Sequence, residues 1–240
     1  MALSCSGLLA HLRHNLQRDP GRWLLVLALV ATAAAYAPTL GYGLVNYDDP
    51  WLYRDNWVVQ HPSWASVKMI FGEFSLDGRM VLGAEYLPIR DLSVMLDYLV
   101  WDRWYGGFHL TNLLLYLAAI AVWFKALEGF GIDRFVCGLA VLLWAVHPTH
   151  VESVAWLAER KGLLAMAWAG VATLAYARYR AGPSAWLALA MLAAVCAVWS
   201  KAPGAFAIAA LVGFELSLPD RRRSWRRSLV GLAANRERVT

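Results

Sequence analysis

Polar residues that could do chemistry interrupt this apolar sequence at three places. Asp48 and Asp49 stand at the first, residues 147–161 form the second, and Lys201 marks the third. A carboxylate beside cations suits transfer from a phosphate-activated donor, because the acid takes a proton from an attacking hydroxyl while Lys or Arg stabilises the departing phosphate. We therefore predict Asp48 or Asp49 as the catalytic base. The predicted phosphate-binding cations are Arg160, Lys161 and Lys201.

The residues themselves leave two alternatives open. Neighbouring carboxylates tend to titrate separately, so one of Asp48 and Asp49 can stay protonated, and the sequence does not say which is the base. The cations can also serve a simpler purpose, capping helices and meeting lipid headgroups, and this alternative is strongest for Lys161.

The second interruption also contains imidazoles and acids that could line a pocket. His147, His150 and Glu152 have a spacing that could hold a divalent cation. Pro148 interrupts the run, however, and no spacing fixes a fourth ligand. We therefore predict hydrogen bonding within a cavity rather than a metal site, and leave the use of a divalent metal open. Glu159 is predicted to line the same pocket.

The composition indicates an integral membrane protein. Of the 240 residues, 60% are hydrophobic and only 16% are charged, whereas a soluble domain has about 25% charged residues. The net charge of +5 does not indicate nucleic acid as a partner, because the basic excess sits at the ends of apolar segments and in the C-terminal tail. The isolated cysteines Cys5, Cys137 and Cys196 predict no disulfide framework, and we expect small buried side chains.

Apolar segments predict an all-α membrane protein with about six spans. A straight crossing takes about 20 residues, so the third and fourth segments are short. Pro38 would occupy the first position after a signal-peptide cleavage at Ala35-Tyr36-Ala37, which favours an uncleaved first span. The predicted segments are residues 23–44, 108–127, 135–147, 162–177, 185–199 and 202–218.

The distribution of basic residues predicts the orientation. Fourteen of the 22 Lys and Arg residues fall on the side that holds both termini, against three in the short turns of the other side. The positive-inside rule then places both termini in the cytoplasm. The predicted parts are a basic N-terminus (1–22), a first span (23–44), a long external loop (45–107), five further spans (108–218) and a basic cytoplasmic tail (219–240).

Two stretches of the external loop have helical apolar periodicity. One runs from Trp64 to Phe74 and the other from Leu92 to Leu99. Both are too short and too charged to cross a membrane, so we expect interfacial helices with their apolar faces toward lipid. The alternative is a small external subdomain in which these faces pack together.

Four blocks in order resemble the transmembrane and tetratricopeptide repeat-containing (TMTC) family. The first is residues 46–50 (NYDDP), followed by Asn56. The second runs from Tyr86-Leu87-Pro88 through residues 96–98 (LDY) to residues 108–115 (FHLTNLLL). The third is residues 147–156 (HPTHVESVAW), followed by Glu-Arg-Lys at 159–161, and the fourth is Ser200-Lys201.

The resemblance implies a glycosyltransferase of the GT-C type, for which this chain would be the front half. It implies transfer of a sugar, mannose in eukaryotic members, from a polyprenyl-phosphate donor to protein Ser or Thr hydroxyls outside the cytoplasm. The family's loop aspartate falls on Asp48 or Asp49. The family's Tyr-Arg-Pro is Tyr86-Leu87-Pro88 here, which makes Tyr86 a pocket residue and Arg90 a further candidate cation.

The resemblance also implies partners and a location. Family members continue through further spans and tetratricopeptide repeats, so we expect a fragment, or half of a split enzyme whose second chain supplies those parts. The short turns suggest a bacterial inner-membrane protein. The alternative functions are a non-catalytic relative and a transporter. The sugar, the acceptor and the oligomeric state stay open.

Overall fold

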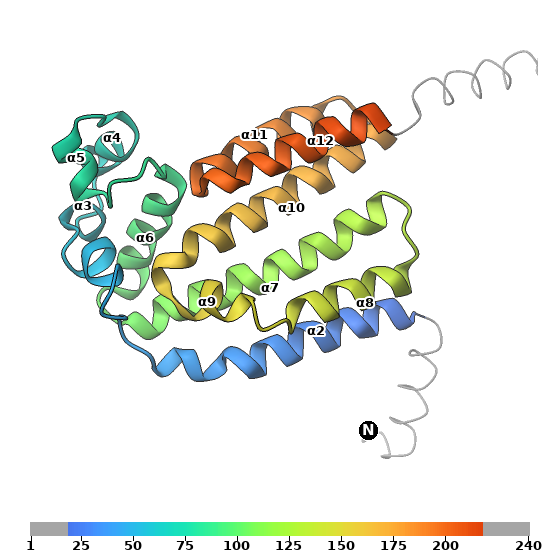
Figure 1. Ribbon diagram of the computed structural model, residues 1–240, viewed down its shortest axis with the longest axis horizontal. Helices are drawn as coiled ribbons and strands as arrows, with labels where there is room; N and C mark the ends of the chain where they lie inside the picture. The colour runs from blue at the N-terminus through green and yellow to red at the C-terminus, as the bar shows by residue number, and fades with distance from the viewer. Residues whose placement is uncertain (1–18, 218–240) are drawn as a thin grey trace, which may run out of the picture.

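Six helices lie side by side in a bundle in the computed structural model, which describes residues 19–217 (Figure 1). Each overlaps one of the six apolar segments expected from the sequence. Helix α10 packs against α7 and α11, α2 packs against α8 and α7, and α12 packs against α11 and α10. The bundle helices are α2 (Pro20–Tyr36), α7 (Tyr105–Gly129), α8 (Arg134–Ala145), α10 (Arg160–Ala181), α11 (Ala185–Ser200) and α12 (Ala205–Ser217).

Shorter helices connect the bundle helices or gather at one end of them. The segment from η2 to α6, here called the loop unit, sits at one end of the bundle (Figure 1). The described residues contain helices, turns and loops but no strand. The loop unit comprises η2 (Pro50–Arg54), α3 (Trp57–Gln60), α4 (Trp64–Gly72), α5 (Leu76–Val81) and α6 (Pro88–Trp101). The other short elements are η1 (Ala37–Gly41), α9 (His150–Ala155), η3 (Leu157–Glu159) and η4 (Ala202–Gly204).

Aspartate caps define the bundle end that lies away from the loop unit. Asp19 precedes Pro20 and accepts a hydrogen bond from the Arg22 backbone N–H at 3.1 Å, which starts α2. Asp133 caps α8 in the same way. Arg134 donates to Asp19 at 2.7 Å and joins the two helix starts. The turns after α7 and α10 lie at this same end (Figure 1).

Glycines bring α2 and α8 into close contact. A Cβ atom added to Gly138 would lie 2.5 Å from the carbonyl oxygen of Gly21, and one added to Gly21 would overlap the backbone of Arg134. Small residues of this kind let helix backbones approach closely where lipid surrounds them.

Replacing Gly138 with Ala is expected to destabilise the protein by about 1–3 kcal/mol, because α2 and α8 must move apart. Thermal unfolding of the purified protein in detergent measures the effect. The matched control is Gly213→Ala in α12, where an added Cβ meets no atom within 4 Å. Since Ala favours a helix over Gly by about 1 kcal/mol, the control is expected to be neutral or stabilising. Equal melting temperatures for the two variants would contradict the close contact.

Two segments are long and apolar enough to cross a membrane. They are Pro20–Gly41 and Tyr105–Gly129, with mean hydropathies of 1.9 and 1.7 over their most apolar windows. Only 22% and 39% of those windows is buried inside the protein. Soluble core helices would be covered by protein, so this exposed apolar surface suggests a membrane protein.

The other bundle helices do not meet the same criterion for a span. The helices Arg134–Ala145, Ala185–Ser200 and Ala202–Ser217 are apolar but shorter. Helix α10 is 22 residues long but has arginines at both ends, including Arg160 and Arg180. Two candidate spans are therefore found among residues 19–217, where the sequence predicted six.

The loop unit covers part of the two apolar helix faces that were expected to face lipid. Ile70 of α4 is fully buried, and Met95 of α6 is 5% exposed. Both belong to one apolar cluster, which the loop unit shares with Phe108 of α7 and Leu157 of η3. Trp64 and Phe74 remain exposed, as do Leu96 and Leu99. The apolar faces therefore pack partly on each other, as the subdomain alternative supposed, because short helices bury more apolar area together than singly.

Cys137 is a free, buried thiol, as expected, whereas the free thiol of Cys196 is only half-buried. Cys5 lies outside the described residues, as do residues 1–18 of the basic N-terminus and the tail 219–240.

Candidate functional site

Asp49 joins the first loop, which is the chain that follows α2 and η1, to the connection between α9 and α10. Its side chain is fully buried. One carboxylate oxygen accepts the Ala158 N–H at 2.8 Å, and the other accepts the Val45 N–H at 2.9 Å. Burial raises the pKa of Asp49, while these two backbone donors oppose the rise. The aspartates therefore lie beside the turn at 159–161, although about 110 residues of chain separate them.

Asp48 is only half-buried and differs from its neighbour. Among residues 19–217, no hydrogen bond or ion pair involves its carboxylate. Beside it, the Tyr47 ring is 73% exposed and lies 5.8 Å from the Trp156 ring. The Trp156 indole favours the charged form of Asp49, although its Nε1 lies outside normal hydrogen-bond geometry. Asp48 is thus the accessible carboxylate of the pair.

Arg160 is an internal tie between helices. Its side chain is fully buried, and Nη1 lies 2.5 Å from an oxygen of Asp97 in α6. Nε donates to the Asn112 side chain at 2.7 Å, and Nη2 donates to the Phe108 carbonyl at 2.8 Å, both in α7. Every guanidinium nitrogen is therefore engaged, and none is free for a phosphate. Asn112 and Thr111 both hydrogen-bond to other helices, since Thr111 donates to Asp97 of α6 at 2.7 Å.

Arg90 is also enclosed. It is 1% exposed and contacts Asp91 at 2.8 Å, Glu85 at 3.1 Å and the Leu82 carbonyl at 2.6 Å. Tyr86 donates its hydroxyl to the Phe71 carbonyl at 3.0 Å within the loop unit. In this structure neither predicted residue turns a free polar group toward the aspartates, so both support the loop unit.

The two lysines are the more accessible predicted cations. Lys161 donates to Glu85 at 2.9 Å, and its side chain is 16% exposed. Lys201 donates to Glu159 at 2.7 Å, and its side chain is 33% exposed. Each ammonium has three donors, so these ion pairs leave capacity for an anionic ligand.

The imidazoles lie apart from this arrangement. His147 is exposed and hydrogen-bonds to Thr149 at 2.8 Å, and Glu152 is exposed nearby. The His150 ring packs against the Trp144 ring at 4.8 Å, on the wall of an apolar cavity of about 520 Å³. Burial lowers the pKa of His150. Within residues 19–217, no group of three or more His, Cys, Asp or Glu is arranged to hold a metal.

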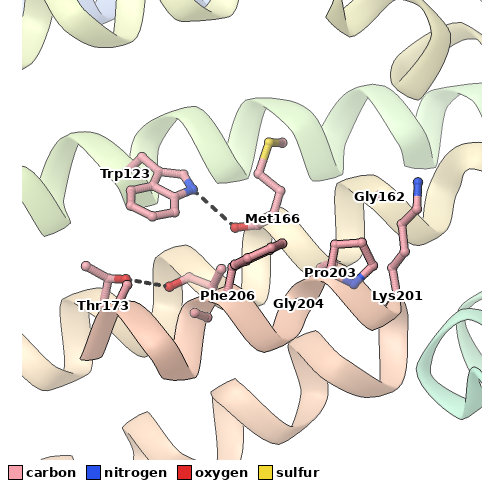
Figure 2. A pocket seen from close by; sticks show the side chains of 12 residues that line it. Trp123, Gly162, Met166, Thr173, Lys201, Pro203, Gly204 and Phe206 are labelled. Atoms are coloured by element: carbon pink, nitrogen blue, oxygen red, sulfur yellow. Dashed lines mark hydrogen bonds between the residues drawn. The ribbon is translucent and has the colours of Figure 1, made fainter. Parts of the chain in front are cut away.

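A groove of about 390 Å³ was not predicted from the sequence. It lies between α10, α7 and the η4–α12 segment, with Lys201 at one end and Thr173 at the other (Figure 2). Its floor on α10 is made by Gly162, Ala165 and Ala169. The spacing of these small residues, at i, i+3 and i+7 on one helix face, is the signal that could have revealed it.

Comparisons with known proteins find relatives by sequence only. No protein-family model matches the chain, and no solved structure does. Protein O-mannosyl-transferase TMTC3 of Homo sapiens is 32% identical over 98 residues, which are 41% of this chain. Tmtc2 of Drosophila melanogaster, also named a protein O-mannosyl-transferase, is 31% identical over 198 residues, or 78% of the chain. Tmtc1 of the same species is 34% identical over 92 residues, or 38% of the chain.

The chain spans a small part of these relatives. The matched residues cover 10% of human TMTC3, 21% of Tmtc2 and 11% of Tmtc1. The longest match nevertheless extends over most of this chain. These similarities support a relationship between this chain and the TMTC-type protein O-mannosyl-transferases.

Proposed function

We propose that this chain carries the site of a membrane glycosyltransferase that moves a sugar from a polyprenyl-phosphate donor to a hydroxyl acceptor. The hydrogen bond from Ala158 to Asp49 carries the proposal, because it brings acid and cations to one end of the bundle. The names of the relatives support sugar transfer to a protein hydroxyl.

In the proposed reaction, Asp48 takes the proton of the acceptor hydroxyl. The acceptor oxygen then forms a bond to the sugar's anomeric carbon as the bond from that carbon to the phosphate oxygen breaks. The polyprenyl phosphate leaves with the bonding electron pair, and Lys201 and Lys161 stabilise its charge. Asp49 holds the first loop against Ala158 and so positions Asp48.

The proposed setting is a bacterial inner membrane with a GT-C-like bundle. All six bundle helices would span it, both termini would be cytoplasmic, and the loop unit would lie outside. The basic turns after α7 and α10 support this orientation, because they lie at the bundle end away from the loop unit. Further spans and repeats would come from a longer chain or from a second one.

A non-catalytic membrane protein is the second candidate. The enclosure of Arg160 and Arg90 favours it, because two of the four predicted phosphate-binding cations are committed to internal contacts. Such a protein would keep the bundle and bind a partner without transferring sugar.

The two candidates differ in turnover. The purified chain, reconstituted in liposomes, is given radiolabelled mannosyl polyprenyl phosphate with or without a Ser- and Thr-containing peptide. Sugar transfer to the peptide, or sugar release to water, above protein-free liposomes is the expected result. If neither reaction is detected at micromolar protein, the result contradicts the enzyme proposal and favours the non-catalytic candidate.

A further inference from the structure

The groove beside α10 has one charged end and an apolar interior. Gly162 and Lys201 stand at one end and Thr173 at the other (Figure 2). A helix rises about 1.5 Å per residue, so the part of α10 from Gly162 to Thr173 is about 16 Å long. The polar groups along it are satisfied internally: Thr173 donates to the Ala169 carbonyl at 2.8 Å, and the Trp123 indole donates to the Met166 carbonyl at 3.1 Å.

The charged end is held in place by an ion pair. The Lys201 ammonium lies 2.7 Å from a carboxylate oxygen of Glu159, the residue that precedes α10. A Cβ atom added to Gly162 would lie 3.9 Å from the same ammonium. The ammonium therefore sits over the first turn of α10, where the helix dipole also favours a negative charge.

We propose that this groove binds the hydrocarbon chain of a lipid monophosphate, with the phosphate at Lys201. The inference rests on the proposed function and adds a binding site for its lipid donor. Charge complementarity selects this occupant, because a single cation at one end of an apolar groove matches one anionic head on one apolar tail. Phe206, which is 76% exposed on the rim, adds apolar surface for the chain.

Glu159 is a positioning residue in this arrangement. It uses one of the three Lys201 donors and leaves the others for phosphate oxygens. It also places the bound phosphate one residue from Ala158, whose N–H binds Asp49. The charged end of the groove thus lies beside Glu159, whose neighbour Ala158 binds Asp49.

Equilibrium binding of radiolabelled geranylgeranyl phosphate to the full chain in detergent tests the proposal. We expect saturable binding that geranylgeraniol and inorganic phosphate each compete for poorly, because each offers only half of the recognised chemistry. Binding that inorganic phosphate alone displaces would identify a simple anion site and overturn the proposal. Equal displacement by phosphatidylglycerol would identify a general lipid surface and overturn it too.

Variants locate the binding in the groove. Lys201→Gln is expected to weaken binding about tenfold or more, through loss of charge-assisted hydrogen bonds. Ala210→Trp places an indole in the groove from an exposed position of α12 and is expected to weaken binding similarly. Leu192→Trp, on the 60% exposed outer side of α11, is the matched control and should bind normally. Unchanged binding in both groove variants would overturn the proposal.

The probe contains no sugar, so the result is independent of catalysis. Binding without turnover would keep the groove and contradict only the enzyme proposal. If the chain turns over the donor while the groove variants bind the probe normally, the enzyme proposal stands and the groove proposal is contradicted.

Discussion

Replacing Arg160 with Met is expected to lower the free energy of unfolding by about 3–5 kcal/mol, because it leaves Asp97 buried without its cation. The side chains of Arg160 and Asp97 are 0% and 6% exposed. The loss also removes the donors to Asn112 and to the Phe108 carbonyl, so α6, α7 and α10 lose a shared tie. Denaturant titration in detergent, followed by circular dichroism, measures the change.

The matched control is Arg54→Met, which breaks an exposed ion pair with Asp55. Surface pairs contribute about 0–1 kcal/mol, so the control should be nearly neutral. The double variant Arg160→Met with Asp97→Asn should recover part of the loss, because it removes both buried charges. If Arg160→Met were as stable as the control but bound lipid phosphate poorly, the internal role would be wrong and the predicted phosphate-binding role would be favoured.

The bundle helices were predictable because apolar runs can be read directly from the sequence. Covering was not. Periodicity places Ile70 and Met95 on apolar helix faces, but either lipid or protein can cover such a face. Only the fold shows that these residues pack together. Three apolar helices, Arg134–Ala145, Ala185–Ser200 and Ala202–Ser217, are shorter than a straight crossing needs, and hydropathy alone does not decide whether they span.

The site was predictable in its location but less so in its roles. Three polar interruptions converge at one end of the bundle, as expected from their places between spans. The sequence shows that Arg160 is charged, but not that Asp97 and Asn112 come from other helices to meet it. The groove depends on small residues that carry no reactive group, so only their spacing on one helix face could have indicated it. The pattern of residue types therefore located the site. The packing showed which charged residues are committed to internal contacts and which are accessible.

Asp48 and Asp49 should differ when each is replaced with Asn. Asp48 is half-buried without a partner among the described residues, so it can meet an acceptor hydroxyl. Removing a general base costs about 10²- to 10⁴-fold in rate, and Asp48→Asn should lose this in kcat with an unchanged melting temperature. Sugar release and transfer from the labelled donor, set against thermal unfolding, measure both quantities.

Asp49→Asn should lower activity together with stability. An Asn side chain offers one acceptor oxygen where Asp49 meets two backbone donors, so either the Val45 or the Ala158 contact is lost. An unsatisfied buried donor costs about 1–3 kcal/mol, and the freed first loop would misplace Asp48. Binding of geranylgeranyl phosphate should persist in both variants, because Lys201 and the groove are untouched. Full stability with complete loss of turnover in Asp49→Asn, beside an active Asp48→Asn, would reverse the two roles: the buried carboxylate would be the base, and the loop would have to open for the acceptor to reach it.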